Sequence, residues 1–138
     1  MSPTPSARAV AFTEVATTSG AQDGPGGMLV VGSTDASRAT IALRVPSATV
    51  AAGRILVAAF QGEQNTGGYA VHITAIERSG DQLLVRATFT VPGPGAFVTQ
   101  VLTSPAHVVS IAAADATGVR EAILFDSSGV ERARASTT

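Results

Sequence analysis

The feature that most constrains the fold is a hairpin pattern between Gly68 and Val91. Its second half alternates strictly, with Leu83, Val85, Ala87, Phe89 and Val91 on one face. Such alternation is typical of a strand that buries one side. The first half, Tyr69 to Ile76, alternates more weakly, and the turn-forming run Ser79 to Gln82 separates the two. The pattern therefore predicts an antiparallel β-hairpin.

A further apolar run precedes this hairpin. Ile55 to Phe60 is uncharged and rich in β-branched and small residues, and the polar connector Gln61 to Gly68 joins it to the hairpin. Further strands are predicted at 9–16, 28–31, 97–102, 106–113 and 120–125. About eight short strands, with turn residues roughly every ten positions, indicate a mainly β fold: an antiparallel β-sandwich or a partly closed barrel.

These boundaries predict one domain. Residues 1–8 are expected to be a disordered N-terminal segment, 9–130 a single β domain, and 131–138 a frayed C-terminal tail.

The segment from Ser33 to Val45 fits two structures. Alternating Ala39, Ile41, Leu43 and Val45 slightly favour a strand, whereas a Ser33 or Thr34 cap and a face of Ala36, Ala39, Thr40 and Leu43 fit one short helix.

Composition excludes several classes of function. Hydrophobic residues make up 45% of the chain, charged residues 14%, and the formal net charge is −1. The nine cations are all Arg and form no basic cluster, so we expect no nucleic-acid partner. No apolar run approaches the ~20 residues of a membrane span, and cysteine is absent, which excludes disulfides. The N-terminus lacks a signal-peptide pattern, and Met1 fits either a native start or an added one.

The side chains that could perform catalysis are few. His72 and His107 are the only histidines, no GxSxG element is present, and the acidic residues are scattered. Glu63, His72 and Glu77 lack the spacing of a metal site. The Thr66 to Gly68 turn opens a strand rather than a helix, which argues against a phosphate loop. We therefore expect no enzymatic activity, no catalytic residue, no metal and no cofactor.

The connector before the hairpin has two interpretations of equal weight. It either fixes the register of the sheet or is presented to a protein partner, and its candidate binding residues are Glu63, Gln64, Asn65, Thr66, Gly67, Gly68 and Tyr69. In the structural interpretation, Gly67 or Gly68 adopts a positive φ. Structural turn residues are predicted at Pro92, Gly93, Thr103 and Pro105.

The stretch from Gly62 to Ile73 resembles the PrcB C-terminal domain family, the protease complex subunit PrcB proteins. The shared signature is a glycine, two or three polar residues, TGGY and an alternating apolar strand. The Pro92 segment, the run Thr103-Ser104-Pro105 before an apolar strand, and the opening from Phe12 to Gly20 also fit. The resemblance covers most of Val10 to Ile111. It favours a short helix at 33–45, although the aromatic residue usual there is missing.

The resemblance implies a non-enzymatic, extracytoplasmic accessory domain with a protein partner, such as a protease. A fold alone does not fix a function, so this inference is one of association. With so apolar a composition, an open strand edge could also pair with another copy of the chain.

An alternative function rests on a second similarity. Asn65 to Tyr69 is similar to the NPTTGY loop of chagasin-type protease inhibitors, and Pro92 to Phe97 could stand for their second, glycine-containing loop. The proline that follows the asparagine in that motif and the RPW motif of the third loop are both absent. In this alternative, the loop at 63–69 would block a protease cleft.

Overall fold

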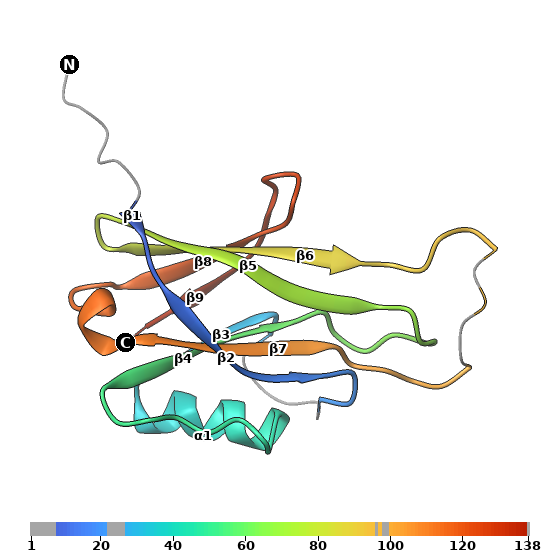
Figure 1. Cartoon of the computed structure of the whole chain (residues 1–138), viewed down its shortest axis with the longest axis horizontal. Helices are drawn as coiled ribbons and strands as arrows, with labels where there is room; N and C mark the ends of the chain where they lie inside the picture. The colour runs from blue at the N-terminus through green and yellow to red at the C-terminus, as the bar shows by residue number, and fades with distance from the viewer. Residues whose placement is uncertain (1–7, 22–26, 96, 98–99, 138) are drawn as a thin grey trace.

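The computed structural model describes residues 8–21, 27–95, 97 and 100–137. This part of the chain forms nine strands, one α-helix and a 3₁₀ turn (Figure 1). In order they are β1 Arg8–Ala9, β2 Phe12–Thr18, β3 Leu29–Gly32, α1 Asp35–Arg44, β4 Arg54–Phe60, β5 Ala70–Ser79, β6 Gln82–Thr90, β7 Ala106–Ala112, η1 Ala113–Ala116, β8 Glu121–Phe125 and β9 Glu131–Ser136. Among the described residues, no helix is long and apolar enough to cross a membrane.

The strands form two sheets that face each other. One sheet has the order β1-β5-β6-β8-β9 and the other β2-β7-β4-β3, with α1 against the outer face of the second (Figure 1). This confirms the predicted mainly β sandwich with one short helix, and neither sheet closes into a barrel. All strand pairs are antiparallel except β6 and β8, which run parallel.

The predicted hairpin is present as β5 and β6, in register from Ala70 opposite Thr90 to Ser79 opposite Gln82. Leu83, Val85 and Ala87 are buried as their alternation predicts. The alternation of β5 is interrupted by a bulge between Ile73 and Ala75. A bulge shifts the following side chains to the other face, so Ile76 is buried although the sequence placed it opposite Ile73.

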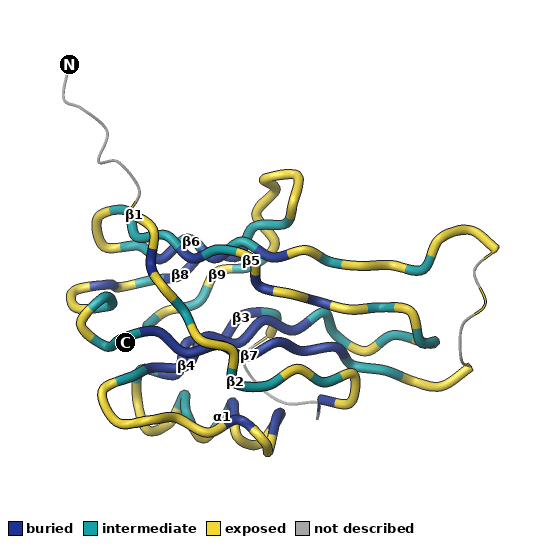
Figure 2. The backbone as a smooth tube through the Cα atoms, viewed as in Figure 1, coloured by how far each residue is buried: buried dark blue, intermediate teal, exposed yellow. Residues whose placement is uncertain are grey.

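The main core lies between the sheets, where the central strands are the most buried parts of the chain (Figure 2). A smaller apolar cluster joins α1 and the loop after it to the outer face of β4 and β7, with Phe60 and Ile41 fully buried. The core contains Val, Leu, Ile and Ala rather than large aromatic rings, as the composition predicts.

Residues 35–44 are helical because Thr34 caps them. Its hydroxyl accepts from the Ser37 N–H, and the Ser37 hydroxyl accepts from the Thr34 N–H, which forms a capping box. The predicted buried face of this helix, which included Leu43, is wrong: Ile41 and Arg44 are buried, and Leu43 is exposed. The helix lies close to β3 because Gly32 has no side chain: a Cβ there would come within 3.0 Å of Ile41 Cδ1.

Three other sequence expectations need correction or fall partly outside the described residues. The predicted strand 9–16 is divided: β1 pairs with β5 and β2 with β7, so the chain crosses from one sheet to the other. The predicted strand 97–102 is absent at residues 97 and 100–102, and 98–99 lie outside the described residues. Residues 131–136 are not a tail but β9, paired with β8. Arg8, which was expected to be disordered, lies in β1 and pairs with Arg78, while the expected disorder of residues 1–7 lies outside the described part.

Candidate functional site

The predicted binding loop follows β4 and is held by the segment that leads into β7. The N–H of Gln64 donates to the Thr103 carbonyl at 2.7 Å, and the N–H of Thr103 donates back at 2.9 Å. The Thr103 hydroxyl also donates to the Thr66 carbonyl at 2.8 Å. Two motifs that are far apart in the sequence therefore lie side by side at one end of the sandwich (Figure 1).

The turn inside this loop depends on glycine. Gly68 has a φ of 90°, so the prediction that one of its two glycines has a positive φ is confirmed for Gly68. The Thr66 hydroxyl donates to the Gly67 carbonyl at 3.0 Å. Glu63, Asn65 and Gly68 are exposed, whereas the other predicted loop residues are half-buried. The loop is thus anchored by its main chain and open to solvent at its tip.

The predicted turn residues lie next to this loop. Pro92 and Gly93 follow β6, and the Gln61 side chain ties the two segments together by donating to the Thr90 carbonyl at 3.0 Å. Pro105 is buried, and its carbonyl accepts from the Gln61 N–H at 3.0 Å. The loop 61–69 therefore contacts both ends of the connection from β6 to β7, at Thr90 and at residues 103–105.

Exposed apolar side chains are frequent in the segment between β6 and β7. Of the seven large hydrophobic residues exposed in the described part of the chain, four lie between β6 and β7: Val91, Phe97, Val101 and Leu102. Leu102 keeps 67% of its surface exposed. A cluster of exposed apolar residues at one place commonly marks a protein-binding surface. We call the residues 61–69 and the described residues of 91–105 the loop end.

A small hollow adjoins the loop end. It measures about 260 Å³ and is lined by Tyr69, Ala70, Val71 and Pro105 together with the last residues of β2. Tyr69 is half-buried there rather than projecting freely. The hollow could hold one partner side chain, but not a larger ligand, since pockets for small molecules are usually larger than about 300 Å³.

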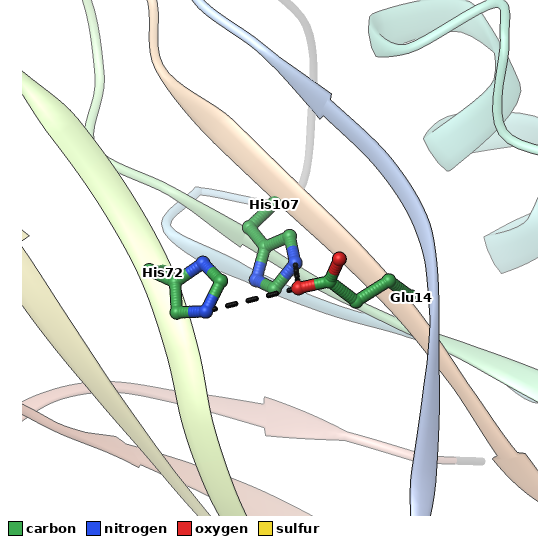
Figure 3. Close-up of side chains that lie close together, drawn as sticks. All are labelled: Glu14, His72 and His107. Carbon is green, nitrogen blue, oxygen red and sulfur yellow. Dashed lines mark ion pairs between the residues drawn. The ribbon is translucent and has the colours of Figure 1, made fainter.

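A second group of functional side chains was not predicted from the sequence. Glu14 of β2, His72 of β5 and His107 of β7 converge where the two sheets meet (Figure 3). Glu14 Oε1 lies 3.4 Å from His107 Nε2 and 3.7 Å from His72 Nε2. The two imidazole rings stack with their centroids 4.5 Å apart. His107 is fully buried, whereas most of the Glu14 and His72 side chains is exposed.

The protonation of His107 follows from its hydrogen bond. The N–H of Ile73 donates to His107 Nδ1 at 2.8 Å, so Nδ1 must be unprotonated and the ring proton resides on Nε2, facing Glu14. Burial, and secondarily the charge of His72, lowers the pKa of His107, although Glu14 acts in the opposite direction. The neutral ring thus joins β7 of one sheet to β5 of the other.

This tautomer argues against a metal at the cluster. The ligand atoms of the three residues lie within 4.8 Å of one another, close enough to suggest a site. However, a histidine that binds a metal through Nε2 has its proton on Nδ1, and here Nδ1 faces an N–H donor. Glu63 and Glu77, whose spacing relative to His72 argued against a metal site in the sequence, do not join the cluster, and Glu77 instead accepts a hydrogen bond from Arg86.

There is a physical reason why the cluster of Glu14, His72 and His107 could not be predicted from the sequence. Its three residues come from strands that are far apart in the sequence, and only the register of β2 against β7 and the packing of β5 against β7 bring them together. His107 is the second residue of the seven-residue strand β7, and its direct neighbours in the sequence, Ala106 and Val108, are apolar and do not reveal its acceptor role.

One protein-family model matches the part of the chain that contains the loop end. Residues 55–112 match the family model PrcB C-terminal. The match agrees with the resemblance predicted from the TGGY element, and it runs from β4 through β7, including the loop end. No curated protein and no solved structure matches the chain.

Proposed function

We propose that the chain is a non-enzymatic protein-binding module that serves as an accessory subunit of an extracytoplasmic protease complex. The observation that carries this proposal is the concentration of exposed apolar side chains at the loop end, within the region that matches the PrcB C-terminal family. Burying Val101 and Leu102 against a partner would be favourable, since each large apolar side chain contributes about 1.5–3 kcal/mol when fully buried.

The architecture supports a rigid presentation of this surface. Main-chain hydrogen bonds between Gln64 and Thr103 fix these two residues relative to each other, so binding does not have to order the part of the loop end around them. A preorganised surface loses less conformational entropy when it binds. The buried, neutral His107 is inaccessible to a substrate, which agrees with a binding rather than a catalytic role.

A matched pair of variants tests the proposal. Leu102 and Leu43 are 67% and 68% exposed, but Leu43 lies on α1, away from the loop end. The tagged chain is used to capture partners from its native envelope or medium, and the captured proteins are identified by mass spectrometry. We expect Leu102→Ser to lose the partner, a protease or protease subunit, and Leu43→Ser to retain it. Equal capture by both variants, or partners unrelated to proteolysis, would contradict the proposal.

One observation favours the alternative function, a protease inhibitor. The two loops that resemble those of chagasin-type inhibitors, 63–69 and 92–97, start from points joined by the Gln61 to Thr90 hydrogen bond. A cleft-blocking inhibitor needs such neighbouring loops. Titration against papain and a serine protease separates the functions, because an accessory subunit should leave both proteases fully active while an inhibitor should slow the cysteine protease.

A further inference from the structure

The histidine cluster, which consists of Glu14, His72 and His107, adjoins the hollow beside the loop end. Val71 and Pro105 line the hollow, and they lie one residue before His72 and two residues before His107. The third wall of the hollow comes from the end of β2, the strand that carries Glu14. The cluster and the hollow are therefore built on the same three strands, β2, β5 and β7.

The first half of β5 is held on one side by His107 instead of by a strand. β1 pairs with β5 at Arg78 and Glu77, so in the described part of the chain no strand lies beside residues 71–75 on that side. The Ile73 N–H instead donates to His107 Nδ1 at 2.8 Å. This hydrogen bond therefore joins the β5 wall of the hollow to the β7 wall.

The bond can exist only while His107 is neutral. Because Nδ1 accepts from Ile73, the single ring proton is on Nε2. A second proton would occupy Nδ1 and place one N–H donor against another, and two donors cannot form a hydrogen bond. Protonation of His107 and its bond to Ile73 thus exclude each other.

The surroundings of His107 resist a second proton. Glu14 Oε1 lies 3.4 Å from His107 Nε2 and 3.7 Å from His72 Nε2, so one carboxylate faces two rings (Figure 3). The stacked rings have centroids 4.5 Å apart, and two positive rings at this distance repel each other. β4 places Ala59 opposite His107, so among the described residues the titratable groups that face this ring are Glu14 and His72.

Acid consequently favours a state in which the ring is released. Burial, and secondarily the charge of His72, lowers the pKa of His107 in the closed structure. A ring released into solvent takes up its proton at a higher pH than the closed ring does. By linkage, lowering the pH below the ordinary imidazole value of about 6.5 shifts the equilibrium toward the released state.

We propose that the histidine cluster is a pH switch: in mild acid His107 takes up a proton from solvent at Nδ1, loses the Ile73 bond, and lets the walls of the hollow separate. The ladders from β5 to β6 and from β4 to β7 do not use the ring, so the rest of the sandwich stays folded. Weaker binding at the loop end in acid is a consequence that rests on the proposed function, whereas the switch itself does not.

Hydrogen exchange of the ¹⁵N-labelled chain tests the release of Ile73. We expect the protection factor of the Ile73 amide to fall by about tenfold or more between about pH 7 and about pH 5. The amide of Val57, which is fully buried in the other sheet, should lose much less protection. An unchanged Ile73, or an equal loss at both amides, would overturn the proposal, because the second result describes unfolding of the whole domain.

Tyrosine fluorescence tests the opening of the hollow. Tyr69 is the only tyrosine and the chain has no tryptophan, so the intrinsic fluorescence reports on this residue. We expect acrylamide to quench Tyr69 more strongly at about pH 5 than at about pH 7. In His107→Asn, whose amide oxygen accepts a hydrogen bond but does not titrate, quenching should be the same at both values. Constant quenching of the wild type, or an equal acid response in His107→Asn, contradicts the switch.

Two variants at mostly exposed side chains complete the test, since neither removes a buried group. His72→Phe keeps a ring to stack on His107 but carries no positive charge, so we expect a smaller acid response of Ile73 and Tyr69. Glu14→Gln removes the carboxylate that favours the protonated ring, so the response should be larger. Changes in the same direction in both variants would rule the switch out. These measurements use the chain alone, so their outcome is separate from whether Leu102→Ser loses a protease.

Discussion

His107 shows how one buried side chain can hold two sheets together. Its Nδ1 accepts the Ile73 N–H from the facing sheet, next to the bulge that interrupts β5. Without this acceptor, a buried N–H would lack a partner, which costs about 1–3 kcal/mol. Leucine approximates the volume of the ring but cannot accept a hydrogen bond. We therefore expect His107→Leu to lower the free energy of unfolding by about 1–3 kcal/mol in urea denaturation.

The control for this prediction is the neighbouring ring. His72 stacks on His107 but is largely exposed, and its ring accepts no main-chain hydrogen bond from the described residues, so His72→Ala should change stability by about 0.5 kcal/mol or less. If both variants are equally stable, the Ile73 hydrogen bond does not contribute, and the inter-sheet role of His107 is wrong.

The same residue predicts how stability depends on pH. Burial lowers the pKa of His107 in the folded chain below its ordinary value of 6.5. The unfolded chain therefore takes up this proton at a higher pH than the folded chain does. The contribution of His107 to stability is complete above about pH 6.5 and decreases as the pH falls below that value, until the lowered pKa of the folded state is reached.

Urea denaturation at several pH values between 7.5 and 4.5 measures this effect. The difference in free energy of unfolding between the wild-type chain and His107→Leu should shrink as the pH falls, because only the wild type has the buried ring to protonate. A difference that stays constant over this range would show that His107 is not the responsible group.

At the scale of elements, β9 is the clearest departure from the sequence pattern. Its sequence, ERARAS, lacks the apolar alternation that identifies a strand, yet β9 pairs with β8 along its length. It is stabilised by β8, whose Ala122, Ile123 and Leu124 are buried, and by ion pairs such as Arg134 with Glu121. Tertiary pairing thus determines a structure that local propensity does not predict.

The ladder of β9 gives a matched test by proline substitution. The Thr137 N–H donates to the Arg120 carbonyl, so by alternation the Ala135 N–H bonds to β8 and the Arg134 N–H points away from it. Proline removes the N–H at either position. We expect Ala135→Pro to lower the thermal midpoint clearly and Arg134→Pro to lower it much less. Equal effects would mean that β9 does not form this ladder in solution.

At the scale of the whole molecule, the sequence predicts the elements better than their assembly. Leu83, Val85 and Ala87 alternate and are buried, and the Thr34 cap together with the family resemblance identifies α1. What could not be predicted depends on contacts between distant segments: the bulge that buries Ile76, the crossing from β1 to β2, and the convergence of Glu14 with the two histidines. None of these leaves a periodic signal in the sequence.

The edges of the assembled sandwich lead to a prediction about association. From the sequence, copies of the chain could pair through strand edges. Three of the four edges discourage this, because β1 is short, β2 is bulged and β9 is charged. The fourth edge, β3, lies recessed between α1 and β9. We therefore expect the purified chain to be monomeric in light scattering, even at high protein concentration.

A variant that uncovers β3 serves as the positive control for this measurement. Ile41 is fully buried between α1 and the sheet, so Ile41→Asp places a charge in the apolar cluster that holds the helix over β4 and beside β3. Detaching α1 should expose both the outer face of the sheet and the β3 edge, and we expect this variant to associate. A monomeric Ile41→Asp chain that keeps its strands would show that the helix is not what protects the edge, and a dimeric wild type would show that the recess does not prevent pairing.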